Sequence, residues 1–369
     1  MDYRTLKDGT RVSTIGIGCS HLDQPDINAV QEMIDVALAN GVNLIDFVMP
    51  VRIAQLFGKA MEGHRESIVM QVHLGPIFNE GQYRRSRDVA EIDANFSELL
   101  EAAGTDYAEL GLIHYVDTQV DFQSVFDSGV WDYALRLRRE GRIRQLGFTS
   151  HSVEIGHKFL DTGEIDAFMF SVNPAYDFDI QENAIRTDNP EMSITEGRRE
   201  LYQRCQREGI AITVMKAFGA GRLLAADTSP FGAAMTIPQC LQYALDRPGV
   251  VSCLLGIHNA EQLRESLLYY QSSTTERDYS FIGSLPVHQV QGQCFYCNHC
   301  LPCPQFIDIG AVGNFMDLAL VGDDLAKEHY ASLPKHASDC IGCGVCETNC
   351  PFIVKIRERM QEAIRVFGY

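Results

Sequence analysis

The segments IRQLGFTS (143–150) and AFMFSVN (167–173) are apolar runs of strand length, separated by enough residues for one helix. Amphipathic patterns typical of helices also occur, for example over residues 27–40, 87–103, 131–140 and 195–208. Eight strand-then-helix units in about 260 residues predict an α/β fold, the closed (β/α)8 TIM barrel. An open doubly wound sheet usually carries a glycine-rich nucleotide turn, and the sequence contains no G-x-G-x-x-G. The other six runs are TIGIGC (14–19), NLIDFV (43–48), IVMQVHL (68–74), LGLIHYV (110–116), AITVMKA (211–217) and VVSCLLGI (250–257).

Both ends of the barrel region carry further signals. The turn Lys7-Asp8-Gly9 predicts a short hairpin that closes the bottom of the barrel. Residues 271–293 show little periodicity, and cysteine becomes frequent after them. We therefore expect a barrel over residues 1–275, a linker over 276–293 and a small C-terminal domain over 294–369.

Composition limits the classes of partner. The 369 residues are 46% hydrophobic and 22% charged, which suits a globular chain with a large core. Lys and Arg number 31 against 49 Asp and Glu, a formal charge of −18, which argues against a nucleic-acid or anionic-membrane partner. No apolar run approaches the roughly 18 residues of a spanning helix, and the polar start lacks a signal peptide's apolar segment. We expect a soluble, cytoplasmic protein.

Eight of the twelve cysteines form two runs of four, Cys294-x2-Cys297-x2-Cys300-x2-Cys303-Pro and Cys340-x2-Cys343-x2-Cys346-x3-Cys350-Pro. The second run has the spacing of bacterial ferredoxins, in which three cysteines bind one cluster and the fourth binds the other. Disulfides do not suit a cytosolic chain, and zinc normally uses paired C-x2-C motifs. We expect one 4Fe-4S cluster on Cys294, Cys297, Cys300 and Cys350, and a second on Cys340, Cys343, Cys346 and Cys303. We expect buried apolar roles for Cys19, Cys205, Cys240 and Cys253.

The first 270 residues resemble the aldo-keto reductase family, and the tail resembles the ferredoxin-like α+β extension of its iron–sulfur subgroup. The resemblance implies a catalytic tetrad of Asp, Tyr, Lys and His, of which Asp46 and His114 are in place. The tyrosine position falls at Pro50 or Val51, and His73 replaces the lysine. The stretches that carry the resemblance are YRTLKDGTRVSTIGIGC (3–19), NLID (43–46), LGLIHY (110–115), GFTSHS (147–152), FSVN (170–173) and GIHNAEQLRES (256–266).

The same comparison shows departures where the family holds its nicotinamide. Met169 replaces a glutamine, and His151 replaces an asparagine. Val214-Met215-Lys216 stands where an aromatic residue often stacks.

Polar residues at the predicted strand ends remain for chemistry, because barrel active sites form there. We expect His73 and His114 to be an acid/base pair with Asp46 orienting or charging one of them; a metal ion on the histidines is an alternative. The loops after the last two strands are suited to a phosphate-bearing cofactor. The expected cofactor residues are Ser150, His151, Asn173, Lys216, Gly219, Gly221, Arg222, Gly256, His258, Asn259 and Gln262.

The clusters favour a particular cofactor. Each cluster carries one electron and a nicotinamide transfers two, whereas a flavin does both. The leading hypothesis is an oxidoreductase in which the clusters exchange electrons with FMN or FAD, and the flavin acts on a small carbonyl or activated C=C substrate. The alternatives are an NADP(H)-dependent carbonyl reductase with structural clusters and a non-catalytic electron-transfer or redox-sensing subunit. A ferredoxin or flavodoxin is an expected electron partner. Residues 177–194 are expected to form either a lid or a variable surface loop.

Overall fold

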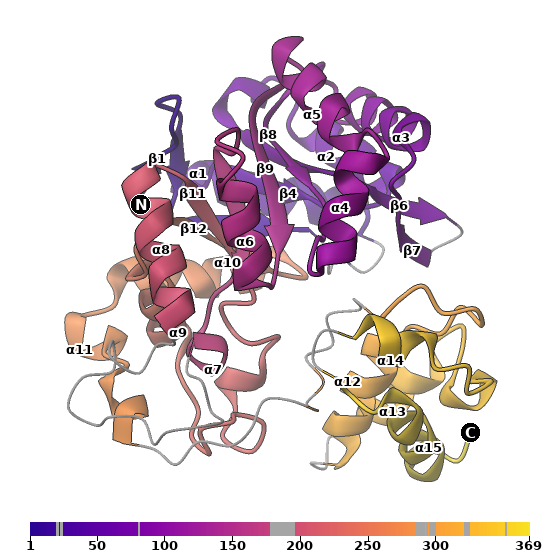
Figure 1. The fold of residues 1–369 in the computed structure, drawn as a ribbon. Helices are drawn as coiled ribbons and strands as arrows, with labels where there is room; N and C mark the ends of the chain where they lie inside the picture. The colour runs from indigo at the N-terminus through magenta and orange to yellow at the C-terminus, as the bar shows by residue number, and fades with distance from the viewer. Residues whose placement is uncertain are drawn as a thin grey trace. The chain divides into compact units, whose positions relative to one another are not determined.

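The computed structural model describes residues 1–19, 22, 25–79, 82–177, 196–284, 292, 294, 300–320, 325–350 and 353–369. Their contacts form two compact units, shown in Figure 1. The first comprises Met1–Phe78 and Arg85–Val287, and the second comprises Asn79–Arg84 and His288–Tyr369. The division at residue 287 falls within the expected linker. No helix in the described part of the chain is both long and apolar enough to cross a membrane.

The first unit contains a closed barrel of eight parallel strands, which confirms the predicted fold. Each of the eight apolar runs contributes one strand, and the strands follow one another around the barrel in chain order. They are β3 (Ile15–Gly18), β4 (Leu44–Phe47), β5 (Val69–Leu74), β8 (Ala108–Ile113), β9 (Ile143–Ser150), β10 (Ala167–Ser171), β11 (Ala211–Met215) and β12 (Val250–Gly256).

Helices follow the strands, and their ends have ordinary capping chemistry. Asp26 caps the first helix by accepting a hydrogen bond from the Ala29 amide, and Gly41 ends it in the left-handed conformation. The helices are α1 (Ile27–Asn40), α2 (Val51–Ala60), α3 (Val89–Ala102), α4 (Gln119–Asp127), α5 (Val130–Arg139), α6 (Val153–Leu160), α7 (Pro174–Asp177), α8 (Glu196–Glu208), α9 (Ile237–Leu245), α10 (Ala260–Leu267) and α11 (Thr274–Arg277).

Two hairpins extend the barrel. The antiparallel pair β1 (Tyr3–Thr5) and β2 (Arg11–Ser13) is the predicted N-terminal hairpin. Its Leu6 and Val12 pack in one buried cluster with residues at the starts of the barrel strands, so it closes the bottom as expected. A second hairpin, β6 (Pro76–Asn79) and β7 (Gln82–Arg85), follows β5 and was not predicted.

The second unit is helical in its described residues from 300 onward, with α12 (Ile309–Leu320), α13 (Leu325–Ala331), α14 (Val345–Asn349) and α15 (Ile356–Phe367). The bounds of α12 match the expected helix. A small core that includes Val312, Met316, Tyr330 and Met360 holds the helices together, and cysteines of both runs pack against it.

A buried ion pair ties α7 to α8. Arg198 Nε donates to Asp177 Oδ1 at 2.6 Å, and both side chains are buried. Asp177 also accepts hydrogen bonds from the hydroxyls of Tyr202 (2.6 Å) and Tyr243 (2.9 Å). This network fixes the residues on either side of 178–195. The expected loop over residues 177–194 lies almost entirely outside the described residues.

Breaking this pair should destabilise the barrel strongly, because it leaves a buried carboxylate without its cation. We expect Arg198→Met to lower the free energy of unfolding by about 3–5 kcal/mol. Urea unfolding followed by fluorescence of Trp131, the single tryptophan, reports on the barrel. The matched control is Arg204→Met on the same helix, whose carboxylate partners Glu208 and Asp161 are exposed; it should cost under about 1 kcal/mol. Equal losses in the two variants would contradict this account.

Candidate active site

The ends of β4, β5 and β8 bring three predicted catalytic residues together. Asp46 lies on β4 beside Gln71 of β5 in the strand register, and His73 follows two residues later on the same face of β5. His114 directly follows β8. All four side chains are at least nine-tenths buried. Asp46, His73 and His114 were expected to act together, whereas Gln71 was not predicted.

Hydrogen bonds join these residues in a line. His73 Nε2 lies 2.8 Å from Asp46 Oδ1, and His73 Nδ1 lies 2.8 Å from His114 Nδ1. We call Asp46, His73 and His114 the His73 chain. Behind it, Gln71 Nε2 donates to the same Asp46 oxygen at 2.7 Å, and Thr213 donates to Gln71 Oε1 at 3.0 Å. Thr213 therefore fixes the orientation of the Gln71 amide, and Gln71 fixes the carboxylate.

The hydrogen-bond pattern sets the proton positions in the His73 chain. When Asp46 is ionised, His73 donates Nε2–H to it, and its Nδ1 can only accept. His114 must then donate Nδ1–H, which places its lone pair on Nε2. Burial holds the pKa of His114 well below 6.5, and the charges of His73, Arg87 and Arg85 add to the effect. His114 is therefore a neutral imidazole at pH 7.

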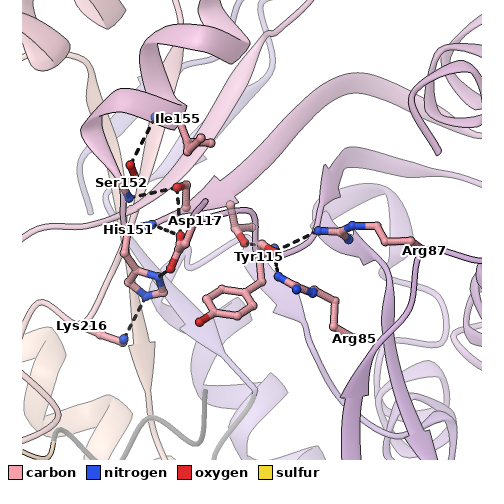
Figure 2. Close-up of polar contacts among 10 residues, drawn as sticks. Arg85, Arg87, Tyr115, Asp117, His151, Ser152, Ile155 and Lys216 are labelled. Carbon is pink, nitrogen blue, oxygen red and sulfur yellow. Dashed lines mark hydrogen bonds and ion pairs between the residues drawn. The ribbon is translucent and has the colours of Figure 1, made fainter. Parts of the chain in front are cut away.

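A second line of polar residues, all partly buried, lies near the ends of β9 and β11 and is drawn in Figure 2. His151 Nδ1 donates to Asp117 Oδ2 at 2.9 Å, and His151 Nε2 accepts from Lys216 Nζ at 3.0 Å. We call Asp117, His151 and Lys216 the His151 chain. Asp117 also accepts from the Ser150 hydroxyl and the His151 amide. His151 and Lys216 were expected near a cofactor, whereas Asp117 was missed.

Charge states in the His151 chain follow from burial and partners. Burial and the charge of Lys216 lower the pKa of His151 below 6.5, so its ring is neutral at pH 7. Burial would raise the pKa of Asp117, but its hydrogen bonds from His151 and Ser150 outweigh burial and lower it. The chain is therefore a carboxylate, a neutral imidazole and an ammonium group in line.

Tyr115 stands between the two chains. Its ring centroid lies 6.2 Å from that of His114 and 5.8 Å from that of His151, edge-on to the latter. Arg85 and Arg87 both donate to its carbonyl oxygen, at 2.8 and 3.0 Å. Figure 2 shows these two guanidinium groups reaching the Tyr115 backbone from one side. None of these three residues was predicted, because their role depends on backbone geometry.

The remaining expected cofactor residues lie at the same ends of the strands. The side-chain amide of Asn173 donates to the Lys216 carbonyl at 2.8 Å, and Gly219 and Gly221 have positive φ in the loop after β11, which also contains Arg222. After β12, Asn259 caps α10 by accepting from the Gln262 amide, and Gln262 accepts from the His258 amide. Gly256 and these three residues are exposed, so His258 does not join the buried histidines.

The positions implied by the resemblance have clear structural roles here. Pro50 caps α2 and Val51 begins it, so a helix start occupies the tyrosine position. Met169 is buried in the barrel interior, 3.6 Å from Gln71 Nε2. In the described part of the chain, no group of three His, Cys, Asp or Glu side chains is arranged to hold a metal ion. The alternative of a metal ion on the histidines is therefore not supported there.

The cysteines of the second predicted cluster surround one space. Cys303, Cys340, Cys343 and Cys346 line one small pocket together with apolar residues such as Ile307 and Met360. A four-iron cluster takes one thiolate per iron, so its ligands must surround a cavity of this kind. Left-handed Gly342 and Gly344 make the turns of this loop, and the Gly342 amide points to Cys340 Sγ at 3.4 Å.

The other predicted cluster is described in part. Cys294, Cys300 and Cys350 pack in the core of the second unit, whereas Cys297 lies outside the described residues. The assignment of ligands to each cluster stays a prediction. The four scattered cysteines are buried as expected, and burial raises the pKa of each thiol.

The lowered pKa of His114 predicts a pH-dependent stability. The unfolded chain binds a proton at His114 near pH 6.5 and the folded chain does so only at lower pH, so acid favours unfolding. Wild-type protein should therefore lose unfolding free energy as the pH falls from 7.5 to 5.5. We expect His114→Gln to lose less over the same range, by up to about 1.4 kcal/mol per pH unit. Urea unfolding without oxygen, followed by Trp131 fluorescence, measures this loss. The exposed-residue variant His258→Gln should keep the wild-type slope, and an unchanged slope in His114→Gln would refute the assignment.

Comparisons with known proteins agree with this architecture. The Aldo/keto reductase family model matches residues 14–239, and a 4Fe-4S dicluster domain model matches residues 293–354. Aldo-keto reductase YhdN of Bacillus subtilis is 25% identical over 187 residues, which cover 48% of this chain and 54% of that protein. The match thus spans about half the length of this curated relative.

Two solved structures share the barrel. Aldo-keto reductase AKR11C1 from Bacillus halodurans, in its holo form, aligns with a TM-score of 0.61 and 21% identity over 79% of this chain and 99% of that chain. A putative aldo-keto reductase from Pseudomonas aeruginosa gives a TM-score of 0.56 and 24% identity over 72% and 93%. At these identities the likeness shows the fold alone. The family model covers more than half of the chain's residues, so the chain belongs to the aldo/keto reductase family, and it carries a C-terminal 4Fe-4S dicluster domain.

Proposed function

We propose that this protein is an iron–sulfur flavoenzyme. Its two clusters exchange single electrons with FMN or FAD at the barrel, and its substrate is a small carbonyl compound or an activated C=C bond. The observation that carries the proposal is the His73 chain, which supplies a proton-transfer group at the barrel mouth where the tyrosine and lysine of the family are absent.

The His73 chain can take up or release one proton. A proton that arrives at His114 Nε2 is compensated when His114 Nδ1–H passes to His73 and His73 Nε2–H passes to Asp46. Both transfers run along contacts of 2.8 Å. The chain thus has two states that differ by one proton, and the buried imidazole need not carry a net charge in either of them. This property suits a group that protonates a substrate in one direction and deprotonates it in the other.

The choice of flavin over nicotinamide is supported by the hydrogen bonds of the expected cofactor residues. The Ser150 hydroxyl and the His151 ring bond to Asp117 and Lys216, and the Asn173 amide bonds to the Lys216 backbone. The resemblance assigns the positions of His151 and Lys216 to the nicotinamide site, and here these two side chains bond to each other. When bound, a flavin supplies both hydride transfer and single-electron exchange.

The loops after β11 and β12 would hold the cofactor's phosphate. Gly219 and Gly221 turn the first loop sharply, and Arg222 brings a positive charge to it. The second loop ends at Asn259, the cap of α10, in the place where barrel folds bind phosphate. A ferredoxin or flavodoxin with a basic patch would suit the acidic chain as electron donor.

An NADP(H)-dependent carbonyl reductase is the second candidate, and membership of the aldo/keto reductase family favours it. In that case the clusters are structural. Rapid oxidation of NADPH with aldehydes by protein free of flavin would select this candidate over the flavoenzyme.

Single-turnover kinetics test the role of the His73 chain. Cluster-loaded, flavin-loaded protein is reduced with dithionite and mixed with 2-cyclohexen-1-one or 4-nitrobenzaldehyde. We expect His114→Gln to slow reoxidation by about 10²–10⁴-fold, the usual contribution of a general acid or base, while reduction by dithionite is unchanged.

The matched control is His64→Gln, whose histidine is exposed beyond the end of α2 and has no role in the proposed site. It should react at the wild-type rate with both compounds. Wild-type protein that cannot be loaded with flavin, or a His114→Gln variant with an unchanged rate, would overturn the proposal.

A further inference from the structure

Tyr115 has an unusual backbone conformation. Its φ of 49° lies in the left-handed region, which bulky side chains rarely adopt and which costs of order 1–3 kcal/mol. Three hydrogen bonds hold the residue there: its amide donates to Thr149 Oγ1 at 2.7 Å, and Arg85 and Arg87 donate to its carbonyl. Two cationic side chains therefore stabilise one strained backbone conformation.

The strain determines where the phenol lies. The ring is half-buried between His114 and His151, with the Arg85 guanidinium 5.1 Å from its centroid. Figure 2 shows the Tyr115 hydroxyl directed toward the side of the barrel mouth where His151 and Lys216 lie. Strained residues of this kind cluster at functional sites, and Tyr115 lies at the C-terminal ends of the barrel strands, where barrel active sites form.

The His151 chain keeps positive charge on the same side. Lys216 is also left-handed, with a φ of 62°, and its carbonyl is fixed by Asn173. Its ammonium group is held by the neutral ring of His151, which Asp117 orients. A phenol O–H and an ammonium group are both hydrogen-bond donors, and such donors stabilise an oxygen on which negative charge develops.

The mouth therefore has two chemically different sides. On one side the neutral His114 exchanges a proton through the His73 chain. On the other side Tyr115 and Lys216 can donate hydrogen bonds to an oxygen. A simple carbonyl takes its hydrogen bond and its proton at one atom, so a single group is enough for it. An α,β-unsaturated carbonyl needs a donor at the oxygen and a separate proton donor at the α-carbon, as does any proton exchange next to a carbonyl.

We propose that the substrate is an α,β-unsaturated carbonyl compound whose oxygen accepts a hydrogen bond from Tyr115, with Lys216 beside it, while His114 handles the proton at the α-carbon. The proposal rests on the function proposed above. In the reductive direction a bound flavin would supply the hydride that forms a C–H bond at the β-carbon, while the C=C electron pair moves toward the carbonyl. The oxygen carries the resulting charge, and the α-carbon then takes the proton that His114 Nε2 holds while Asp46 is protonated. As it leaves, the His73 Nδ1 proton returns to His114 and the Asp46 proton returns to His73, so that Asp46 ends ionised. The His73 chain regains its proton from water, and the reverse sequence is desaturation.

The hydrogen bond from Tyr115 can be measured without turnover. The probe is 2-cyclohexen-1-one labelled with ¹³C at the carbonyl, bound to oxidised, flavin-loaded full-length protein and observed by isotope-edited infrared spectroscopy. We expect the carbonyl stretch to move to lower frequency on binding to wild-type protein. The shift should be lost in Tyr115→Phe and reduced in Lys216→Met. It should persist in the matched control Tyr133→Phe, which removes a phenol that bonds to Asp93 on the outer helices.

Reoxidation of the reduced protein provides the second measurement. We expect 2-cyclohexen-1-one to reoxidise wild-type protein at least tenfold faster than 4-nitrobenzaldehyde does, and Tyr115→Phe to slow the enone reaction by about 10²-fold or more, as loss of one such donor usually does. A carbonyl band in Tyr115→Phe identical to that in wild type, or a band unshifted by wild-type protein, overturns the role of Tyr115. An aldehyde reaction as fast as the enone reaction overturns the substrate class.

The two measurements also separate this inference from the proposed function. A shifted band with no reoxidation by either compound supports the oxygen site and contradicts the flavoenzyme function. Reoxidation with an unshifted band supports the flavoenzyme function and contradicts the oxygen site.

Discussion

The carboxylate of Asp46 is buried inside a closed barrel, and a buried charge must be met by hydrogen-bond donors. Gln71 and His73 supply them from the adjacent strand, and each is fixed in turn by a further partner, Thr213 or His114. The line from Thr213 to His114 therefore connects β11, β5, β4 and the end of β8 through the barrel interior. The same contacts that satisfy the charge also leave His114 neutral, with its lone pair on Nε2.

The two histidine chains have related designs and different ends. In both, a carboxylate orients an imidazole ring. The His73 chain ends in a second imidazole, which can exchange a proton at Nε2 when protons shift along the chain to or from Asp46. The His151 chain ends in an ammonium group, which is a fixed positive charge. Tyr115 stands between them because a strained backbone and two arginine side chains place it there. One barrel mouth thus combines a proton-exchanging side with an anion-stabilising side.

Much of the fold could be predicted because local patterns determine it. Apolar runs of strand length marked each of the eight strands, and the Lys7-Asp8-Gly9 turn marked the N-terminal hairpin. The grouping of Asp46, His73 and His114 followed from a rule about strand ends. The second hairpin was missed, because its strands are short and carry no regular alternation.

Other site residues depend on contacts that no local pattern reveals. Asp117 lies two residues beyond Tyr115 in a loop, and only the closure of the barrel brings it to His151. Gln71 and Thr213 are 142 positions apart and meet only inside the barrel. Arg198 and Asp177 likewise pair through tertiary packing. Asp117 is a polar residue just before a helix, and that position could have marked it as a site residue. Many other polar residues in the sequence stand just before helices, so the signal did not single it out.

The proposed flavoenzyme function requires a flavin bound to the barrel and two four-iron clusters bound to the cysteines. The decisive measurement is the absorption spectrum of protein purified without oxygen, before and after acid release of its bound cofactors. The account predicts a broad visible cluster band, iron and sulfide sufficient for two four-iron clusters, and released FMN or FAD. Clusters without any flavin, and no uptake of flavin on reconstitution, would contradict the central claim.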